Sequence, residues 1–136
     1  MSAALALRRA VHAHLAADAA LAALLGGPKV FDEPPADAAL PWAVLAGIES
    51  RDAGAVAHGG EEHRFALDVW SGAAGLSEAL TVAARIARLE DAGLAPEGVH
   101  LVGISWLGTD ARRSPDGRHR IASIRFRAVT EPSFPS

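Results

Sequence analysis

Five residues in the C-terminal half of the chain come nearest to a catalytic motif. The sequence Gly103-Ile104-Ser105-Trp106-Leu107 shares its first glycine and its serine with the Gly-x-Ser-x-Gly turn of α/β hydrolases, which exposes a nucleophilic serine between a strand and a helix. Here leucine stands where the final glycine is required, and the surrounding residues alternate as in a strand. Because a hydrolase needs both the turn and a partner base, Ser105 is interpreted as an ordinary strand residue.

Histidines and glycines suggest three other kinds of site, and none is complete. Two positions apart on a helix, His12 and His14 point about 200° from each other, so they cannot share a metal ion. The sequence His58-Gly59-Gly60 could form an oxyanion loop, but no activated nucleophile accompanies it. Residues 26–29, GGPK, lack the hydroxyl residue and the spacing of a phosphate-binding loop. We therefore expect no catalytic residue, no metal site and no cofactor, and we do not expect an enzyme.

Composition narrows the remaining classes of function. A chain of 136 residues suits one domain, and the absence of cysteine removes disulfides and thiolate metal sites. The net charge of −3 gives no overall basic field for nucleic acid, and seven aromatic residues without a tyrosine offer little for stacking on bases. No apolar run approaches the ~18 residues that a membrane span needs.

The periodicity of apolar residues predicts the elements that must position any functional side chain. Helical spacing predicts a helix over residues 2–17, a short helix capped by Asp18, and a third helix over residues 76–91. Two-residue alternation and apolar runs predict four long strands, over residues 42–50, 62–71, 98–107 and 118–130. We expect one α+β domain over residues 1–130, with a mostly antiparallel sheet and the helices packed on one face, followed by a loose C-terminal tail over residues 131–136.

The alternation also predicts which side chains are buried. In the second long strand Phe65, Leu67 and Val69 point one way, while Arg64, Ala66 and Asp68 point the other way. The third helix has an apolar surface wider than one sheet face requires. The predicted core comprises Leu45, Phe65, Leu67, Val69, Leu80, Ile124 and Phe126.

Two polar segments are the candidate contact sites of the chain. Residues 51–60 and 108–117 are predicted to be loops, and both exceed the ~2 to 5 residues that usually close a hairpin. Both combine glycine with arginine and aspartate, and paired charges of this kind select a partner and fix its register. We expect these loops to contact other molecules through Arg51, Asp52, Asp110, Arg112, Arg113 and Asp116.

The order and spacing of the segments resemble the tail-completion family of long-tailed phages, which includes the tail terminators of phages and gene transfer agents. The resemblance begins with the N-terminal helix and Asp18, which lead to Gly26, and continues with Val30-Phe31-Asp32 and a connector with prolines. Pro41-Trp42-Ala43-Val44-Leu45 then opens the first long strand. Residues 63–71, HRFALDVWS, precede 75–79, GLSEA, and the next helix, and a basic hairpin closes the domain.

This resemblance implies a structural protein without active-site residues. Its members form a homomeric ring, which implies six subunits for this chain, on the last ring of the tail tube. The ring ends tube polymerisation and offers a docking surface to the head-side connector or stopper protein. DNA passes through the lumen of the ring, and no membrane partner is expected. The resemblance also implies that the ring is assembled in the bacterial cytoplasm as a component of the particle tail. Two alternatives remain at this stage: another neck or minor-tail component such as a stopper, and a small enzyme or ligand-binding domain.

Overall fold

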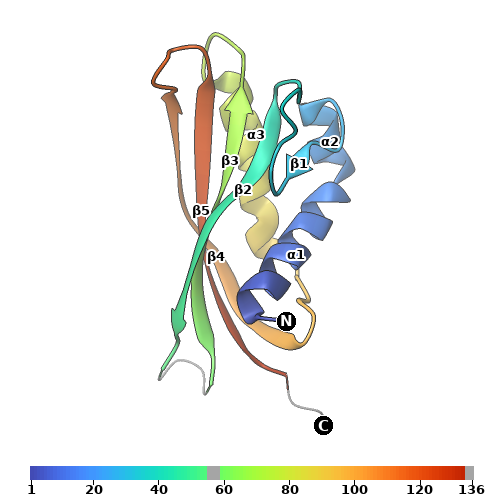
Figure 1. Ribbon diagram of the computed structural model, residues 1–136, viewed down its shortest axis with the longest axis vertical. Helices are drawn as coiled ribbons and strands as arrows, with labels where there is room; N and C mark the ends of the chain where they lie inside the picture. The colour runs from blue at the N-terminus through green and yellow to red at the C-terminus, as the bar shows by residue number, and fades with distance from the viewer. Residues whose placement is uncertain (55–58, 134–136) are drawn as a thin grey trace.

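Five strands form one sheet in the order β1-β2-β3-β5-β4, and helices lie against it (Figure 1). The computed structural model describes residues 1–54 and 59–133. Along the chain the elements are α1 (Ala3–Ala16), α2 (Ala19–Leu25), β1 (Val30–Phe31), β2 (Trp42–Asp52), β3 (Glu61–Ser71), α3 (Ser77–Ala87), the 3-10 helix η1 (Arg88–Asp91), β4 (Val99–Arg113) and β5 (Arg120–Pro132). The α+β class is therefore confirmed.

The sheet is antiparallel except at one edge. β2 pairs with β3, β3 with β5 and β5 with β4, all antiparallel, whereas the two-residue β1 pairs in parallel with Ala43 and Val44 of β2. Two hairpins, β2–β3 and β4–β5, are thus joined by α3, which returns the chain so that β5 lies beside β3 (Figure 1). The edges of the sheet are β4 on one side and β1 with the remainder of β2 on the other.

Three strands run further than the sequence predicted. β2 reaches Asp52, two residues into the predicted loop 51–60, and residues 55–58 of that loop lie outside the described part of the chain. β4 reaches Arg113, so residues 108–113 of the second predicted loop are regular strand. β5 reaches Pro132. Glu131 and Pro132, the first two residues of the predicted C-terminal tail, pair with His100 and Val99 of β4 instead. Proline is tolerated there because it stands at the end of its strand. Residues 134–136 of the predicted tail lie outside the described part of the chain.

Capping groups fix the starts of the two N-terminal helices, and an ion pair joins the second of them to α3. Ser2 accepts a hydrogen bond from the Leu5 N–H at the start of α1. Asp18 caps α2 by accepting from the N–H groups of Ala20 and Leu21, and its carboxylate also receives two hydrogen bonds from Arg85 of α3, at 2.9 and 3.0 Å. Asp18 therefore joins α2 to α3 as well as starting α2.

Replacing Asp18 by alanine is expected to lower the free energy of unfolding by about 1–2 kcal/mol, because the helix loses its cap. Asp18→Asn is the control, since asparagine also caps but cannot form the ion pair, and it should cost less. The hydrogen bond from Arg85 lowers the pKa of Asp18, so this stabilisation is present above about pH 4 and is lost on further acidification. Urea unfolding measures both effects; equal stability of D18A and wild type would contradict them.

The hydrophobic core lies between the helices and the inner face of the sheet. Phe65 and Phe126 occupy paired positions of β3 and β5, and their rings stack with centroids 5.2 Å apart. The other predicted core residues of the sheet, at positions 45, 67, 69 and 124, are also buried. From the helices the core receives Leu7, Val11, Leu15, Leu21, Leu25, Ala79, Val82, Ala83, Ile86 and Leu89.

One predicted core residue is wrong. Leu80 is 44 % exposed, whereas its neighbours Ala79 and Ala83 are buried. The helix turns about 100° per residue, so the buried stripe that contains Val82 and Ile86 excludes position 80. The wide apolar surface of this helix is therefore partly open to solvent rather than covered within the subunit.

Candidate contact surface on the open face of the sheet

The face of the sheet that points away from the helices carries most of its charged side chains. We call it the open face (Figure 1). Strand alternation explains its composition, since each buried core residue of β3 and β5 is followed by a side chain that points the other way. On β3 and β5 these outward residues are Glu62, Arg64, Ala66, Asp68, Trp70, Ile121, Ser123, Arg125, Arg127 and Val129.

One charged network of the open face surrounds Glu62 near the β2–β3 turn. The Glu62 carboxylate accepts hydrogen bonds from Arg51 at 3.0 Å, from Arg64 at 3.0 Å and from Arg127 at 3.2 Å. The hydrogen bonds from Arg64 and Arg51 lower the pKa of Glu62 to about 2. One ionised carboxylate thus ties three strands together, and two of the three arginine charges are left uncompensated by it.

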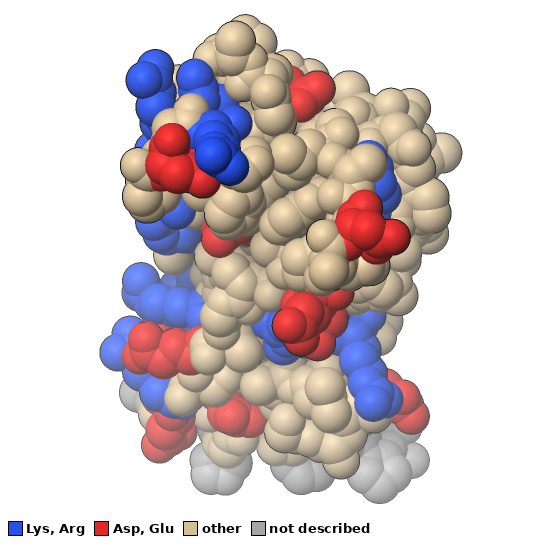
Figure 2. All heavy atoms as spheres, turned by 45° about the horizontal axis from the view of Figure 1, so that its top comes forward, with Lys and Arg blue, Asp and Glu red and all other residues tan. Residues whose placement is uncertain are grey.

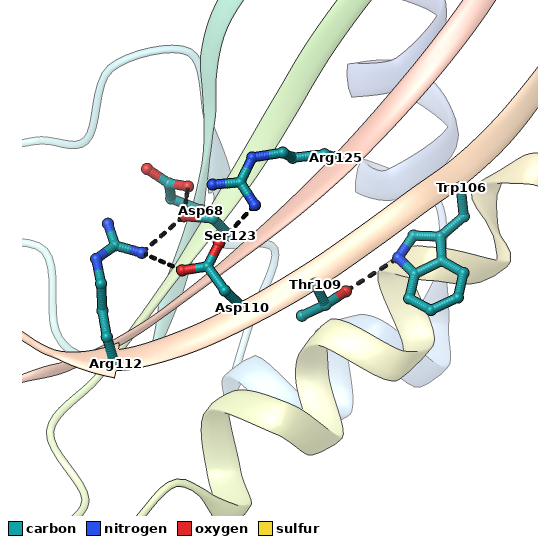
Figure 3. A network of polar contacts seen from close by, with 7 residues as sticks. All are labelled: Asp68, Trp106, Thr109, Asp110, Arg112, Ser123 and Arg125. Atoms are coloured by element: carbon teal, nitrogen blue, oxygen red, sulfur yellow. Dashed lines mark hydrogen bonds and ion pairs between the residues drawn. The ribbon is translucent and has the colours of Figure 1, made fainter.

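A second network lies nearer the other end of the sheet (Figure 3). Asp110 of β4 accepts hydrogen bonds from Arg125 and from Arg112, the latter at 3.0 Å. Arg112 also donates to Ser123, and the Ser123 hydroxyl donates to Asp68 at 2.7 Å. The pKa of Asp110 is lowered, chiefly by Arg125. The alternating chain of acids and arginines holds these side chains in register across β3, β5 and β4.

The turn between β4 and β5 extends the second network into a basic tip. Asp116 accepts from the Ser114 hydroxyl at 2.6 Å and from the Arg118 N–H, which lowers its pKa and closes the turn. The side chain of Arg113 is exposed and has no hydrogen bond or ion pair with the described residues. Figure 2 shows blue side chains gathered around a red one at this end of the molecule. Residues 110–120 contain four arginines and two aspartates, so the tip is positive although the whole chain is negative.

The six predicted contact residues therefore fall into three environments. Arg51 belongs to the Glu62 network, and Asp52 ends β2 by accepting from the Gly54 N–H. Asp110 and Arg112 belong to the second network, with Arg113 beside them on the same strand. Asp116 organises the turn. Arg51 and Asp52 lie in the β2–β3 hairpin, whereas the other four residues lie in the β4–β5 hairpin at the opposite end of the sheet (Figure 1). The structure therefore does not bring these two sets of residues together.

The loop assignment was right for Asp116, which lies in the β4–β5 turn, but wrong for the other five residues, which lie in β2 and β4. Charged side chains at every second position are typical of a strand with one solvated face, and the polar residues of 108–113 follow this pattern with Asp110 and Arg112. The prediction weighted polarity over alternation. It also missed Glu62, Arg64, Arg125 and Arg127, although the spacing Arg125-x-Arg127 and Glu62-x-Arg64 marked them as facing the same side.

The candidate catalytic motifs remain incomplete in the structure. Ser105 lies inside β4 opposite Arg127, not in a strand-to-helix turn. His12 bonds the Val30 carbonyl oxygen, and His14 lies exposed on the same helix. His58 lies outside the described residues. Within residues 1–54 and 59–133, no group of three or more histidines and carboxylates could hold a metal ion, and no helix is long and apolar enough to cross a membrane.

His63 is a buried titratable group that no motif in the sequence marked. His63 is fully buried on the inner face of β3, with Ser50 Oγ 2.6 Å from Nδ1 and Thr130 Oγ1 2.8 Å from Nε2. Burial lowers the pKa of His63. The ring and its two hydroxyl partners tie β2, β3 and β5 together as a neutral group.

This histidine is expected to make the fold sensitive to mild acid. Below its ordinary pKa of about 6.5 the unfolded chain binds the proton more readily than the folded chain, so stability falls as the pH falls from 7 towards 5. His63→Gln keeps a side chain that can bond both hydroxyls but does not titrate. Chemical unfolding at several pH values should therefore show a shallower decline for H63Q than for wild type; parallel curves would contradict this role.

Comparisons with known proteins relate the chain to structural proteins of tailed particles. The family model of tail completion protein gp17 matches residues 9–131. A chain in a solved structure of the virion of a native gene transfer agent particle has a TM-score of 0.83 and 35% sequence identity, covering 96% of this chain and 98% of that one. No curated protein matches the sequence. The chain belongs to the tail completion protein gp17 family, a class of structural tail proteins.

Proposed function

We propose that this protein is a tail terminator: a closed homomeric ring, of six subunits, at the head-proximal end of the tail tube of a phage or gene transfer agent particle. The observation that carries the proposal is the likeness to a gene transfer agent virion chain over nearly the full length of both chains. In this role the ring ends polymerisation of the tube protein and offers a docking surface to the head-side connector or stopper. The protein acts through its surfaces, without a catalytic site or cofactor.

The charges of the domain support a role in docking. Arg112 and Arg113 stand at the basic tip of the β4–β5 hairpin, and the second network holds Arg112 in place. Preordered charges give an interface its register and its choice of partner more than its raw affinity. We assign this tip to the contact with the tube or the connector, and we assign Arg51 and Asp52, at the opposite end of the sheet, to a separate contact.

The lumen of the ring must bind DNA only weakly so that DNA can pass through it. A protein that neutralises many phosphates binds DNA firmly, because it releases the condensed counterions. On the open face, carboxylates already pair with Arg64, Arg112 and Arg125. Because these carboxylates compensate part of the arginine charge, the surface would neutralise fewer phosphates than unpaired arginines would, and DNA could slide past it.

Native mass spectrometry of the protein with its tube protein tests the proposal. We expect a ring mass, six subunits in our assignment, and rings at one end of tubes by electron microscopy. A protein that stays monomeric and never joins tubes would exclude the terminator role and favour a ligand-binding domain or small enzyme. Rings that bind the connector but leave tube length unchanged would instead indicate a stopper or another neck protein.

A further inference from the structure

The β4 edge of the sheet presents apolar side chains that this subunit does not cover. Two β-bulges interrupt its pairing with β5, and the residues left without a partner in the register are Val102 and Leu107. Their side chains are 48 % and 47 % exposed, and that of Trp106 is 44 % exposed. Bulges at a sheet edge redirect side chains out of the regular pleat. The β4 edge therefore has an irregular backbone and exposes apolar side chains to solvent.

This edge is also blocked against the addition of another strand. The backbone N–H of Trp106 donates to the Glu90 carboxylate of η1 at 2.6 Å, so a strand from another chain would have to displace that carboxylate. The indole N–H of Trp106 is likewise satisfied, by Thr109 Oγ1 at 3.0 Å (Figure 3). A partner at this edge would therefore contact the apolar ring of Trp106 beside the negative charge of Glu90. It would bind through its side chains rather than through backbone hydrogen bonds.

A matching hollow lies at the opposite edge of the same sheet. β1 covers only two residues of β2, and between α1 and β2 a cavity of about 380 Å³ opens to solvent. The cavity is lined by Leu5, Arg8, Arg9, His12, Asp32 and Leu45. Leu5 is 42 % exposed here. Arg8 is held by Asp32 and by the carbonyl oxygen of Ala46, which leaves the exposed Arg9 as the free positive charge of the rim among the lining residues.

We propose that the partner of each edge is a second copy of this chain: Trp106 and Val102 of one subunit dock into the α1–β2 cavity of the next, with Glu90 facing Arg9. Indole rings in apolar hollows are frequent anchors of protein interfaces, and the charges of the two edges are complementary. Because the two surfaces differ and lie on opposite edges, the contact is heterologous and can close into a ring. The inference rests on the proposed ring and names the surfaces that build it.

Introduced cysteines test this contact cleanly, because the chain has none of its own. In the double variant Leu5→Cys with Val102→Cys, oxidation of assembled protein should give a ladder of covalent oligomers up to the full ring on non-reducing gels. A contact between identical surfaces would stop at dimers. The control pair is Thr81→Cys with Val102→Cys, which places the first thiol on the exposed side of α3 and should give no ladder.

Substitutions at the interface provide a second readout. Trp106→Ala should reduce the assembled fraction at least tenfold while the monomer stays folded, because the indole is half exposed in the subunit. Arg9→Glu and Glu90→Lys should each weaken assembly, and the double variant should recover part of it. Intact rings without a ladder, unaffected by W106A, would overturn this contact and leave the terminator proposal standing. A wild-type protein that never oligomerises with tube protein would overturn both.

Discussion

Replacing Phe126 by alanine is expected to lower the free energy of unfolding by about 3–5 kcal/mol. The ring is fully buried on the interior strand β5, where it stacks on Phe65, and Phe126 pairs in register with Trp106 of β4. Its removal leaves a cavity in the middle of the sheet that the flanking strands cannot fill. Since small domains are stable by only ~5–15 kcal/mol, F126A should remove a large share of the total.

Urea unfolding measures this loss, with two comparisons. Phe65→Ala removes the other half of the stack and should also cost about 3–5 kcal/mol, because Phe65 is only slightly exposed. Arg125→Ala, the neighbouring residue on the open face, should cost about 1 kcal/mol or less, as for an exposed ion pair. A loss below about 1 kcal/mol for F126A would place Phe126 outside the core and contradict the arrangement described here.

Reversing the charge of the basic tip is expected to abolish docking while preserving the fold. In the double variant Arg112→Glu with Arg113→Glu, two positive charges at one end of the domain are replaced by two negative ones, and like charges would face a partner that selects this tip by its charge. We expect the fraction of tails that carry heads to fall by on the order of tenfold or more, since ~1.4 kcal/mol of lost binding corresponds to a factor of ten.

The fold of this variant should be retained, with a loss of about 1 kcal/mol because Arg112 gives up its bonds to Asp110 and Ser123. Arg113→Glu alone separates docking from stability, since the Arg113 side chain has no bond to the described residues. Arg88→Glu, on the helical side, is the control for charge alone. Electron microscopy of particles provides the count. Normal head joining and normal tail length in the double variant would remove the tip from the contact surface.

Much of the fold follows from local patterns in the sequence. The alternation of Phe65, Leu67 and Val69 with Arg64, Ala66 and Asp68 identified both faces of β3, because a half-buried strand allows only one register. Asp18 and Gly26 marked the ends of α2, since each has a capping role that few other residues fill as well. These features depend on neighbours in the chain, which a single sequence displays.

Features that depend on distant neighbours were not accessible in the same way. Leu80 was assigned to the core because the helix looked apolar almost all round, and only the packed sheet shows which stripe is covered. The bulges that expose Val102 and Leu107 have no marker in the local sequence beyond the nearby glycines. The cavity beside Leu5 and Leu45 joins residues 40 positions apart. Pairing between elements, rather than propensity within them, decides these positions.

In the candidate site, too, the charges could be read from the sequence, but their pairing between strands could not. Five of the six predicted contact residues carry charges that the structure places in specific hydrogen bonds. The places of Arg51, Asp110 and Arg112 in the two networks depend on the register of β2 with β3 and of β4 with β5. Glu62 was overlooked because its three arginine partners come from three strands. The Arg113 side chain is exposed at the end of β4, and its contact with a partner stays a prediction.

The distribution of tail lengths in particles assembled without this protein is the most direct test of its proposed role. A terminator ring stops the tube by occupying its last ring, so its absence should produce tubes of variable and excessive length that carry no heads. Restoring the wild-type chain should return a single length and joined heads, whereas the W106A chain should not if rings form through the β4 edge. Tails of normal, uniform length in the absence of the protein would contradict the terminator role.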